Sequence, residues 1–399
     1  MDKVNYPTLF FHGFMGWGEQ DGVNKYVPYW GILKKRNVLE HLRSEGFEVY
    51  APSMGPWNSA WDRACELWAI IMGGTVDYGK VHSETYGHNR YGRTYPGIIK
   101  DWGEKGPHEM INVVGHSFGG PTVLAFCDLI ANGSKTEREG TDPDDLSPLF
   151  LETKPQKVHC ASTLTGVNNG TTFASWLRKP GVVIISQLCL MLCSVFGNSK
   201  VARYYDFYMD EWNMMDNQYE RTENHLRGPL KIQKQVNRFH KNFFDSIGHE
   251  MKLECMQEIC KKMGPPSPDT YFFAHSGDRT HYDEKRGCRI INKDANFISK
   301  VPAILCSKWG SQYLADNYHW NLDEWTYNDG FVNVPGQKAP FCFPSEDAES
   351  FYQDFKKGIW YNLPTRQNFD HLSWIGMGET VEDTFKFYDD LLARYAELP

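Results

Sequence analysis

The stretch of residues 110–120, MINVVGHSFGG, places Ser117 between two glycines directly after an apolar run. A serine on a strained turn between a strand and a helix exposes its hydroxyl as a nucleophile, and only small neighbours allow that turn. Gly115 and Gly119 are those neighbours. The motif predicts a hydrolase that cleaves esters through Ser117, and a solvated serine in a glycine-rich turn is the alternative.

The residues on either side of this motif have the composition of the two elements that it joins. Residues 111–114 are apolar and predict a buried parallel strand, whereas residues 121–130, PTVLAFCDLI, predict an apolar helix. The N-terminus of that helix then lies beneath Ser117, so the amide of Phe118 is one expected donor to an oxyanion.

A second glycine-rich turn offers the other oxyanion donor. Residues 8–11, TLFF, predict a short strand, which leads into HGFMGWG at residues 12–18. We assign the second donor to the backbone amide of Phe14.

A serine nucleophile also needs a base and an orienting acid, which in this hydrolase class follow it in the order acid, then base. Asp329 lies in the turn of TYNDGFVNV, and His371 lies in the loop of QNFDHLSWIG. As an isolated feature, Asp329 is equally well explained as a turn former. Asp370 is the rival acid, but neighbours on an extended loop point apart, whereas the acid must reach the far imidazole nitrogen.

Six motifs occur here in the order found in the Geobacillus and staphylococcal true lipases, and this resemblance covers nearly the whole chain. They are HGFMGWG, SAWDRACELWAIIMGGTVDYG, GHNRYGRTYPG, GHSFGG, YNDGFVNV and NFDHL. The resemblance implies an α/β-hydrolase fold with a mostly parallel central sheet flanked by helices. It implies one domain over residues 1–399, with a zinc-binding lobe inserted at about 55–95 and 200–265 and a lid helix region at 172–200.

Carried over residue by residue, the resemblance implies a Ser117, Asp329 and His371 triad, with the Phe14 and Phe118 amides as oxyanion donors. It therefore favours Asp329 over Asp370.

The resemblance also implies a structural zinc site, for which Asp62, His82 and His88 match three of the four family ligands. They supply an oxygen and two nitrogens of the kinds that zinc accepts. The six-residue spacing of the two histidines is not helical, so a turn at Gly87 must bring them together. Without the resemblance, two ordinary surface histidines are the better explanation.

The fourth zinc ligand is where the sequence departs from these relatives, which use an aspartate. Our register places His240 there, in the run RFHKNFFDSIG, which also contains Asp245 as the alternative. One carboxylate with three neutral imidazoles leaves a zinc site with a net charge of +1, whereas two carboxylates leave it neutral. Both sets are feasible for zinc.

A second departure concerns the calcium ion that these relatives bind through acidic residues after the catalytic histidine. The corresponding positions here are Ser373, which is a weak calcium ligand, and Gly378, which has no side chain to bind the ion. Because calcium requires several charged oxygens, we expect no calcium site, although Glu379 lies next to Gly378.

Composition limits the partners. A net charge of −8 argues against a nucleic-acid partner and against electrostatic docking on anionic lipid, so we expect any lipid contact to be hydrophobic. The run of residues 182–196, VVIISQLCLMLCSVF, is too short to span a bilayer. It fits a buried core helix equally well, and the resemblance places it at the lid.

The ten cysteines include no CxxC pair, and Cys127, Cys189, Cys193 and Cys306 lie in apolar surroundings that predict small buried side chains. The first strand is expected only a few residues after Met1, which leaves no room for a signal peptide. Since the relatives are secreted, the resemblance implies an extracellular protein whose signal peptide has been removed, and a cytoplasmic protein is the alternative. Nothing in the sequence predicts the oligomeric state.

The predicted function is hydrolysis of water-insoluble carboxylic esters, triacylglycerols first, through an acyl-enzyme on Ser117. A broad carboxylesterase or polyester hydrolase would use the same residues. Two other classes are a hydrolase in which zinc does the chemistry and a noncatalytic lipid-binding protein, which would need a broken triad.

Overall fold

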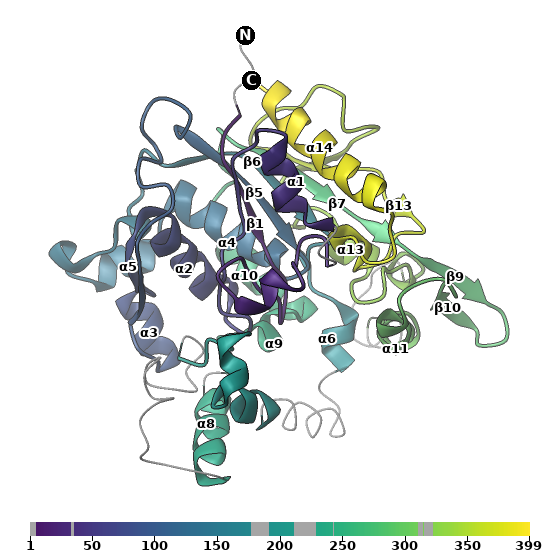
Figure 1. The fold of residues 1–399 in the computed structure, drawn as a ribbon, viewed down its shortest axis with the longest axis horizontal. Helices are drawn as coiled ribbons and strands as arrows, with labels where there is room; N and C mark the ends of the chain where they lie inside the picture. The colour runs from purple at the N-terminus through teal and green to yellow at the C-terminus, as the bar shows by residue number, and fades with distance from the viewer. Residues whose placement is uncertain are drawn as a thin grey trace.

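A parallel sheet forms the centre of the computed structural model (Figure 1). It has seven strands in the order β11-β12-β7-β6-β5-β1-β2. The structure describes residues 5–32, 36–176, 191–210, 229–241, 243–309, 314 and 322–399. All neighbouring strands of the sheet pair in parallel. The strands are β1 (Thr8–Phe11), β2 (Val49–Tyr50), β5 (Met110–His116), β6 (Lys157–Leu164), β7 (Tyr271–His275), β11 (Ser345–Asp347) and β12 (Trp360–Asn362). This architecture confirms the predicted α/β fold.

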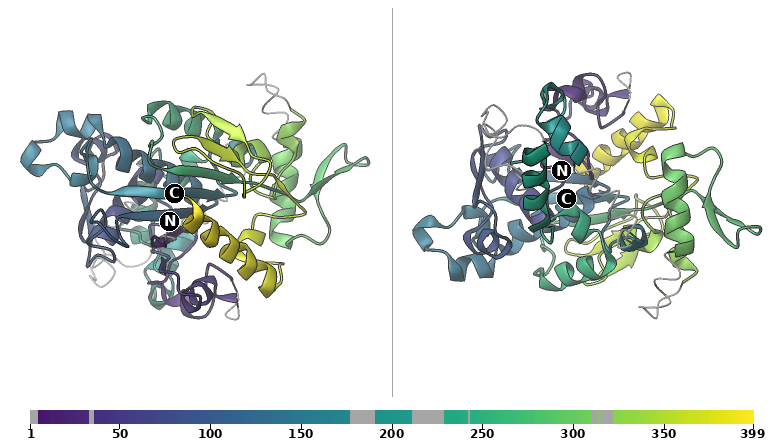
Figure 2. Two further views of the ribbon diagram at one scale, coloured as in Figure 1. Left: turned by 90° about the horizontal axis from the view of Figure 1, so that it is seen from above. Right: turned by 90° about the horizontal axis from the view of Figure 1, so that it is seen from below.

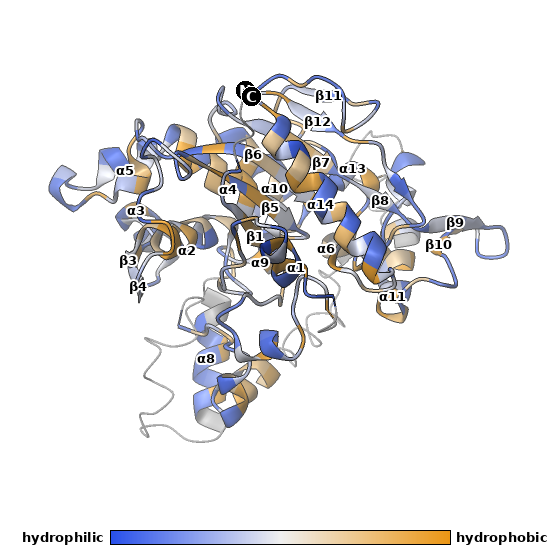
Figure 3. Cartoon of the chain, turned by 45° about the horizontal axis from the view of Figure 1, so that its top comes forward, coloured by the Kyte–Doolittle hydropathy of each residue, from blue (hydrophilic) through white to orange (hydrophobic). Residues whose placement is uncertain are grey.

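Helices cover both faces of the sheet. Because successive strand residues point to opposite faces, Leu9 and Phe11 of β1 join the core beneath α2 (Ala60–Met72) and α4 (Gly119–Asn132). Phe10 instead joins the core beneath α1 (Val38–Ser44) and α14 (Val381–Glu397). Hydrophilic and hydrophobic stretches alternate along α14, as a helix with one buried face requires (Figure 3).

Further elements surround this core. Three two-stranded pairs join β3 (Gly74–Asp77) to β4 (Tyr91–Tyr95), β8 (Gly277–Asp278) to β13 (Arg366–Gln367), and β9 (Thr280–Asp283) to β10 (Cys288–Ile291). Additional helices among the described residues are α3 (Lys80–Tyr86), α5 (Lys135–Gly140), α6 (Thr172–Trp176), α8 (Pro229–Lys241), α9 (Ile247–Glu250), α10 (Leu253–Lys262), α11 (Lys300–Ile304) and α13 (Val334–Gln337). The segment of α5 and the β9–β10 hairpin project at opposite ends of the molecule (Figure 2).

The region expected to form a lid is described in part. It begins with α6, residues 177–190 lie outside the described residues, and residues 191–197 are helical. Apolar side chains of this second helix are exposed, among them Leu192 at 45%, Val195 at 44% and Phe196 at 44%. None of the helices in the described residues combines the length and the hydropathy needed to cross a bilayer.

The cysteines have two structural roles. Cys127, Cys193 and Cys306 are buried, as their apolar surroundings predict, and Cys189 lies outside the described residues. Cys260 of α10 and Cys342 form a disulfide, a pairing that the sequence analysis did not predict.

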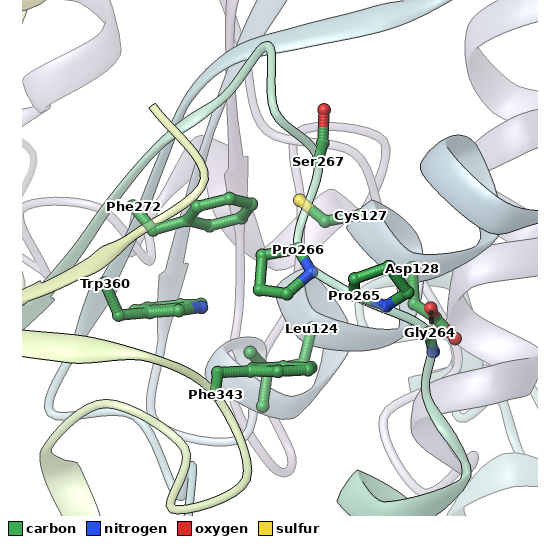
Figure 4. Close-up of a pocket in the computed structure, with 10 residues that line it drawn as sticks. All are labelled: Leu124, Cys127, Asp128, Gly264, Pro265, Pro266, Ser267, Phe272, Phe343 and Trp360. Atoms are coloured by element: carbon green, nitrogen blue, oxygen red, sulfur yellow. Dashed lines mark hydrogen bonds between the residues drawn. The ribbon is translucent and has the colours of Figure 1, made fainter. Parts of the chain in front are cut away.

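A small cavity lies where α4, the loop of residues 264–267 and the end of the sheet meet (Figure 4). The rings of Phe272 and Trp360 stack along one side of it, 5.0 Å apart. Its volume of about 20 Å³ is room for one water molecule, to which the Trp360 Nε1 hydrogen could donate. The cavity is lined by none of the residues singled out in the sequence for chemistry.

Candidate active site and metal centre

Ser117 follows directly after β5 with a backbone φ of +58°, a left-handed conformation that side-chain-bearing residues rarely adopt. Both flanking glycines are required here. A Cβ atom on Gly115 would lie 2.1 Å from the Gly119 carbonyl oxygen, and one on Gly119 would lie 2.3 Å from the Phe11 carbonyl oxygen. The strained turn is therefore possible only with this local sequence, and it lifts the Ser117 hydroxyl above the carboxyl end of the strand.

The structure brings together the three side chains that the sequence predicted as a triad. The Nε2 atom of His371 lies 2.8 Å from Ser117 Oγ, and its Nδ1 atom lies 2.8 Å from Asp329 Oδ2. All three residues sit on segments at the carboxyl edge of the sheet or in the loops beside it. In this arrangement the carboxylate contacts the imidazole and the imidazole contacts the hydroxyl, as in a series of acid, base and nucleophile.

The carboxylate of Asp329 is fully buried. Burial alone raises its pKa, but the adjacent His371 imidazole and several hydrogen bonds outweigh that effect and leave the pKa lowered. The donors are the amides of Phe331 and Val332, at 2.9 and 2.8 Å, and the hydroxyl of Thr165. Asp329 is thus both a turn residue, as its Asp-Gly context indicates, and the partner of His371.

Asp370 is turned away from the imidazole. Its Oδ1 atom accepts hydrogen bonds from the amides of Leu372 and Ser373, and its Oδ2 atom accepts one from the Asn296 amide. The geometry therefore joins Asp329, and not its rival, to His371 Nδ1.

Two backbone amides close to Ser117 in the sequence or the structure lack a protein acceptor. Among the described residues, the amides of Phe14 and Phe118 donate to no protein acceptor, and Phe118 precedes the first turn of α4. The loop that carries Phe14 lies against the nucleophile, since a Cβ atom on Gly13 would be 2.6 Å from Ser117 Cβ. This is the arrangement that an oxyanion hole needs.

Two residues beside this site were missed by sequence reasoning. Thr165 follows the carboxyl end of β6, and the general rule that parallel strands end at one edge is the only signal that points to it. Arg63 is fully buried; it donates to the His12 carbonyl oxygen and lies 5.7 Å from the centre of the Phe118 ring. No spacing in the sequence predicts that contact.

The second predicted cluster also assembles. Asp62 of α2, His82 of α3, His88 after α3 and Asp245 after α8 each offer one ligand atom, and these atoms all lie within 4.8 Å of one another. His82 Nε2 is 3.2 Å from Asp62 Oδ1 and 3.1 Å from Asp245 Oδ2. The turn that joins the two histidines is at Gly87, which caps α3 with a φ of +75°.

Among the described side chains, the fourth member of this group is Asp245, the alternative to the His240 that our register selected. His240 lies in α8, and its side chain is outside the described residues. The helix ends at Lys241, and Asp245, four positions on, lies beside the histidines. The structure therefore favours the alternative set of two carboxylates and two imidazoles.

This donor set fits a divalent metal ion. The polar contacts that the structure shows for Asp62 Oδ1 and His88 Nε2, both buried, lie within the group itself: His82 Nε2 is 3.2 Å from the first atom and Asp245 Oδ2 is 3.2 Å from the second, as expected for atoms that share a metal. His88 Nδ1 is 2.8 Å from the Asn89 carbonyl oxygen, an acceptor that fixes the proton on Nδ1 and leaves Nε2 with a lone pair. A cavity of about 480 Å³ bordered by His82 and Asp245 gives an ion access to the group.

The region in which the sequence predicts no calcium site contains a positively charged side chain, that of Arg279. The guanidinium of Arg279 lies 3.7 Å from Glu379 Oε1 and 4.0 Å from Asp370 Oδ2. Ser373 contributes its hydroxyl to Asp370. The absence of a calcium site stays a prediction.

Residues 4–398 match the family model described as the lipase-like, C-terminal domain. A curated lipase of Staphylococcus epidermidis is 30% identical over 397 residues, a match that covers 98% of this chain and 52% of the relative. The chain therefore spans about half the length of the curated relatives it matches.

Solved structures agree with this assignment. The lipase of Staphylococcus hyicus superposes with a TM-score of 0.79 at 26% identity, covering 98% of this chain and 97% of that one. The EstA protein of Clostridium botulinum gives a TM-score of 0.78 at 30% identity, with 99% and 88% covered. With a family model matched over almost every residue, the chain belongs to the family of the lipase-like C-terminal domain.

Proposed function

We propose that this chain is a serine carboxylic ester hydrolase that acts on water-insoluble esters and that its principal substrates are triacylglycerols. The observation that carries the proposal is the hydrogen-bonded series Ser117, His371 and Asp329 beneath a strained turn, with the Phe14 and Phe118 amides beside it. The names of the similar lipases of Staphylococcus epidermidis and Staphylococcus hyicus support this substrate class.

The proposed reaction is acyl transfer in two halves. His371 Nε2 takes the proton of Ser117 Oγ as this oxygen attacks the ester carbonyl, and the oxyanion receives hydrogen bonds from the two amides. His371 then protonates the departing alcohol. Water, activated by the same imidazole, releases the fatty acid, while Asp329 holds the imidazole in one tautomer and stabilises its charged form.

The proposed metal is Zn²⁺, held by Asp62, His82, His88 and Asp245, with a structural role. Bound there, zinc would supply charge neutralisation for two buried carboxylates and a cross-link between distant parts of the chain. In the proposed reaction, proton transfer belongs to His371 alone.

The exposed apolar residues of the 191–197 helix support a hydrophobic contact with lipid. Leu192, Val195 and Phe196 lie in the region that we propose as the lid, and an exposed apolar face of this kind is stabilised by contact with an apolar interface. The Cys260–Cys342 disulfide supports an extracellular location, because such bonds persist in oxidising compartments.

The test is hydrolysis of an ester series, from soluble short-chain to emulsified long-chain substrates, by the wild type and Ser117→Ala with and without a chelator. We expect the variant to lose activity by several orders of magnitude, with its melting temperature retained. Chelation should mainly lower the melting temperature. Ser162→Ala, which truncates another buried serine on β6, is the matched control and should keep its rate.

Each alternative function predicts a different pattern in this experiment. Activity that survives Ser117→Ala but disappears on chelation would assign the chemistry to the metal. Rates that decline steadily with chain length would identify a broad carboxylesterase or polyester hydrolase. A wild type that binds emulsions without hydrolysing any ester would be a lipid-binding protein.

A further inference from the structure

A buried chain of hydrogen bonds connects the loop of Gly13 with the loop of His371. The Gly13 amide donates to the Tyr29 hydroxyl at 2.9 Å, and this hydroxyl lies 2.7 Å from His116 Nδ1. On its other side, His116 Nε2 lies 2.8 Å from the His371 carbonyl oxygen. Tyr29 and His116 are 6% and 1% exposed, so water does not compete for these contacts.

The partners fix the direction of every bond in this chain. A backbone carbonyl only accepts, so His116 must carry its proton on Nε2 and donate to His371. A neutral imidazole has one N–H, and therefore its Nδ1 atom accepts the Tyr29 hydroxyl proton. The Tyr29 oxygen is then left to accept from the Gly13 amide.

The electrostatics agree with a neutral His116. Burial, and after it the nearby His371, lower the pKa of His116 to about 3. Burial likewise raises the pKa of Tyr29, so its hydroxyl stays protonated. The hydrogen bond to the His371 carbonyl and the nearby Asp329 carboxylate act in the opposite direction on the pKa of His116, but burial and the His371 ring outweigh them.

We propose that Tyr29 and His116 are positioning residues that set the distance between the oxyanion loop and His371. The proposal rests on the proposed function, because it concerns the geometry of that reaction. Gly13 immediately precedes Phe14 and packs against Ser117, so the Tyr29 end of the chain locates one oxyanion donor. The His116 end holds the backbone of the base itself.

This role differs from ordinary core packing because the two ends belong to different catalytic components. His371 is already held from one side, where its amide donates to the Asp329 carbonyl oxygen at 2.9 Å. The bond from His116 to the His371 carbonyl holds the same residue from the other side. Loss of any hydrogen bond in this series should let the base and the oxyanion donor shift relative to each other. Displacements of about 1 Å cost up to about 100-fold in rate.

The first measurement is kcat and KM of Tyr29→Phe on a soluble short-chain ester. The variant keeps the ring and loses only the hydroxyl, so we expect kcat to fall about tenfold or more with KM nearly unchanged. Tyr395→Phe is the matched control, since it removes a buried hydroxyl bonded to Ser162 in the same core. An equal effect of both variants on kcat and on melting temperature would overturn the proposal.

Two substitutions of His116 each remove a different one of its two hydrogen bonds. Asparagine places an oxygen near the position of Nδ1 and keeps an acceptor for Tyr29, whereas glutamine places an N–H near Nε2 and keeps a donor for His371. We expect both to lower kcat, and adding Tyr29→Phe to His116→Gln to cost little more, because that link is already broken. If the losses of kcat in the two single variants add fully in the double variant, Tyr29 and His116 do not act through one connected series of hydrogen bonds.

A spectroscopic readout covers the case in which a His116 variant does not fold. The ¹⁵N resonances of the His116 ring in the wild-type protein should show a neutral Nε2–H tautomer that does not titrate between pH 5 and 8. A proton on Nδ1, or titration in this range, would overturn the assignment. Since Ser117→Ala tests catalysis independently, an inactive Ser117→Ala together with an unaffected Tyr29→Phe would refute only the positioning role.

Discussion

Asp329 is fully buried, and the proposed chemistry depends on keeping its carboxylate charged. A buried carboxylate loses the solvation that stabilises its charge, so it needs several donors in place of water. Here the donors are two backbone amides, the Thr165 hydroxyl and the His371 ring. Thr165 itself has a φ of +48°, an unusual conformation that directs its side chain to the carboxylate.

We predict that Thr165→Val lowers kcat by about tenfold, because a hydrogen bond to a charged group contributes roughly 1.5–3 kcal/mol. The pKa of Asp329 should rise relative to the wild type, since one of the contacts that lower it is lost. The measurement is steady-state kinetics on a soluble ester. Thr384→Val, which removes a buried hydroxyl from α14, is the control, and equal rates in the two variants would contradict the prediction.

At the scale of helices and strands, the cluster of Asp62, His82, His88 and Asp245 connects parts of the chain that the sheet does not hold together. Its residues come from α2, from α3 and the turn after it, and from the loop after α8. These elements lie in the two stretches that the sequence analysis proposed as inserted, 55–95 and 200–265. A bound ion would therefore hold the two stretches together.

Metal content distinguishes the two ligand sets. We predict that Asp245→Ala, purified after loading with Zn²⁺, binds less than one metal ion per chain and melts at a lower temperature. His240→Ala should keep both the metal and the melting temperature, since Asp62, His82, His88 and Asp245 already supply four ligand atoms. Elemental analysis and calorimetry measure both properties. Loss of metal in His240→Ala with retention in Asp245→Ala would restore the set with three histidines.

A second prediction at this scale concerns β7, which ends at His275 among the rings of Phe351, Trp374 and Phe387. Burial, and after it Arg366, lower the pKa of His275 from 6.5 to about 3. In the unfolded chain His275 binds a proton below about pH 6.5, whereas in the folded chain it does so only near pH 3. Between these pH values the unfolded state binds more protons, so His275 lowers the free energy of unfolding as the pH falls.

In His275→Phe this penalty is absent. We predict that the free energy of unfolding of the variant, relative to the wild type, improves by about 2 kcal/mol between pH 7 and pH 5, since one pKa unit corresponds to about 1.4 kcal/mol. Urea unfolding of both proteins at the two pH values gives the difference. A constant difference would mean that His275 has the same pKa in the folded and the unfolded protein.

For the molecule as a whole, the Cys260–Cys342 disulfide closes a loop with a sequence separation of 82 residues. The loop contains α11, α13 and Asp329, so the bond restricts the unfolded chain around much of the site. We predict that reduction lowers the free energy of unfolding by about 2–5 kcal/mol. Denaturant unfolding with and without a reductant measures this change, and Cys342→Ser should be insensitive to the reductant. Equal stability of reduced and oxidised wild type would contradict the prediction.

The sequence alone determined the parts of this protein that depend on near neighbours. The strained turn at Ser117 needs small residues two positions away on each side, and the close contacts of Gly115 and Gly119 explain why the motif identified it. The strand of residues 8–11 and the helix that follows Ser117 were visible in the same way, because an apolar period and a turn are local properties. The predicted α/β fold followed from these elements and from the resemblance.

Only the tertiary structure decided which distant residues meet. It brought Asp245, which follows the end of α8, beside His82 and His88. Thr165 and Asp329 are 164 positions apart, and His116 and His371 are 255 apart. No periodicity extends over such separations, so the residues that tune and position the site become visible only when the sheet brings their strands to one edge.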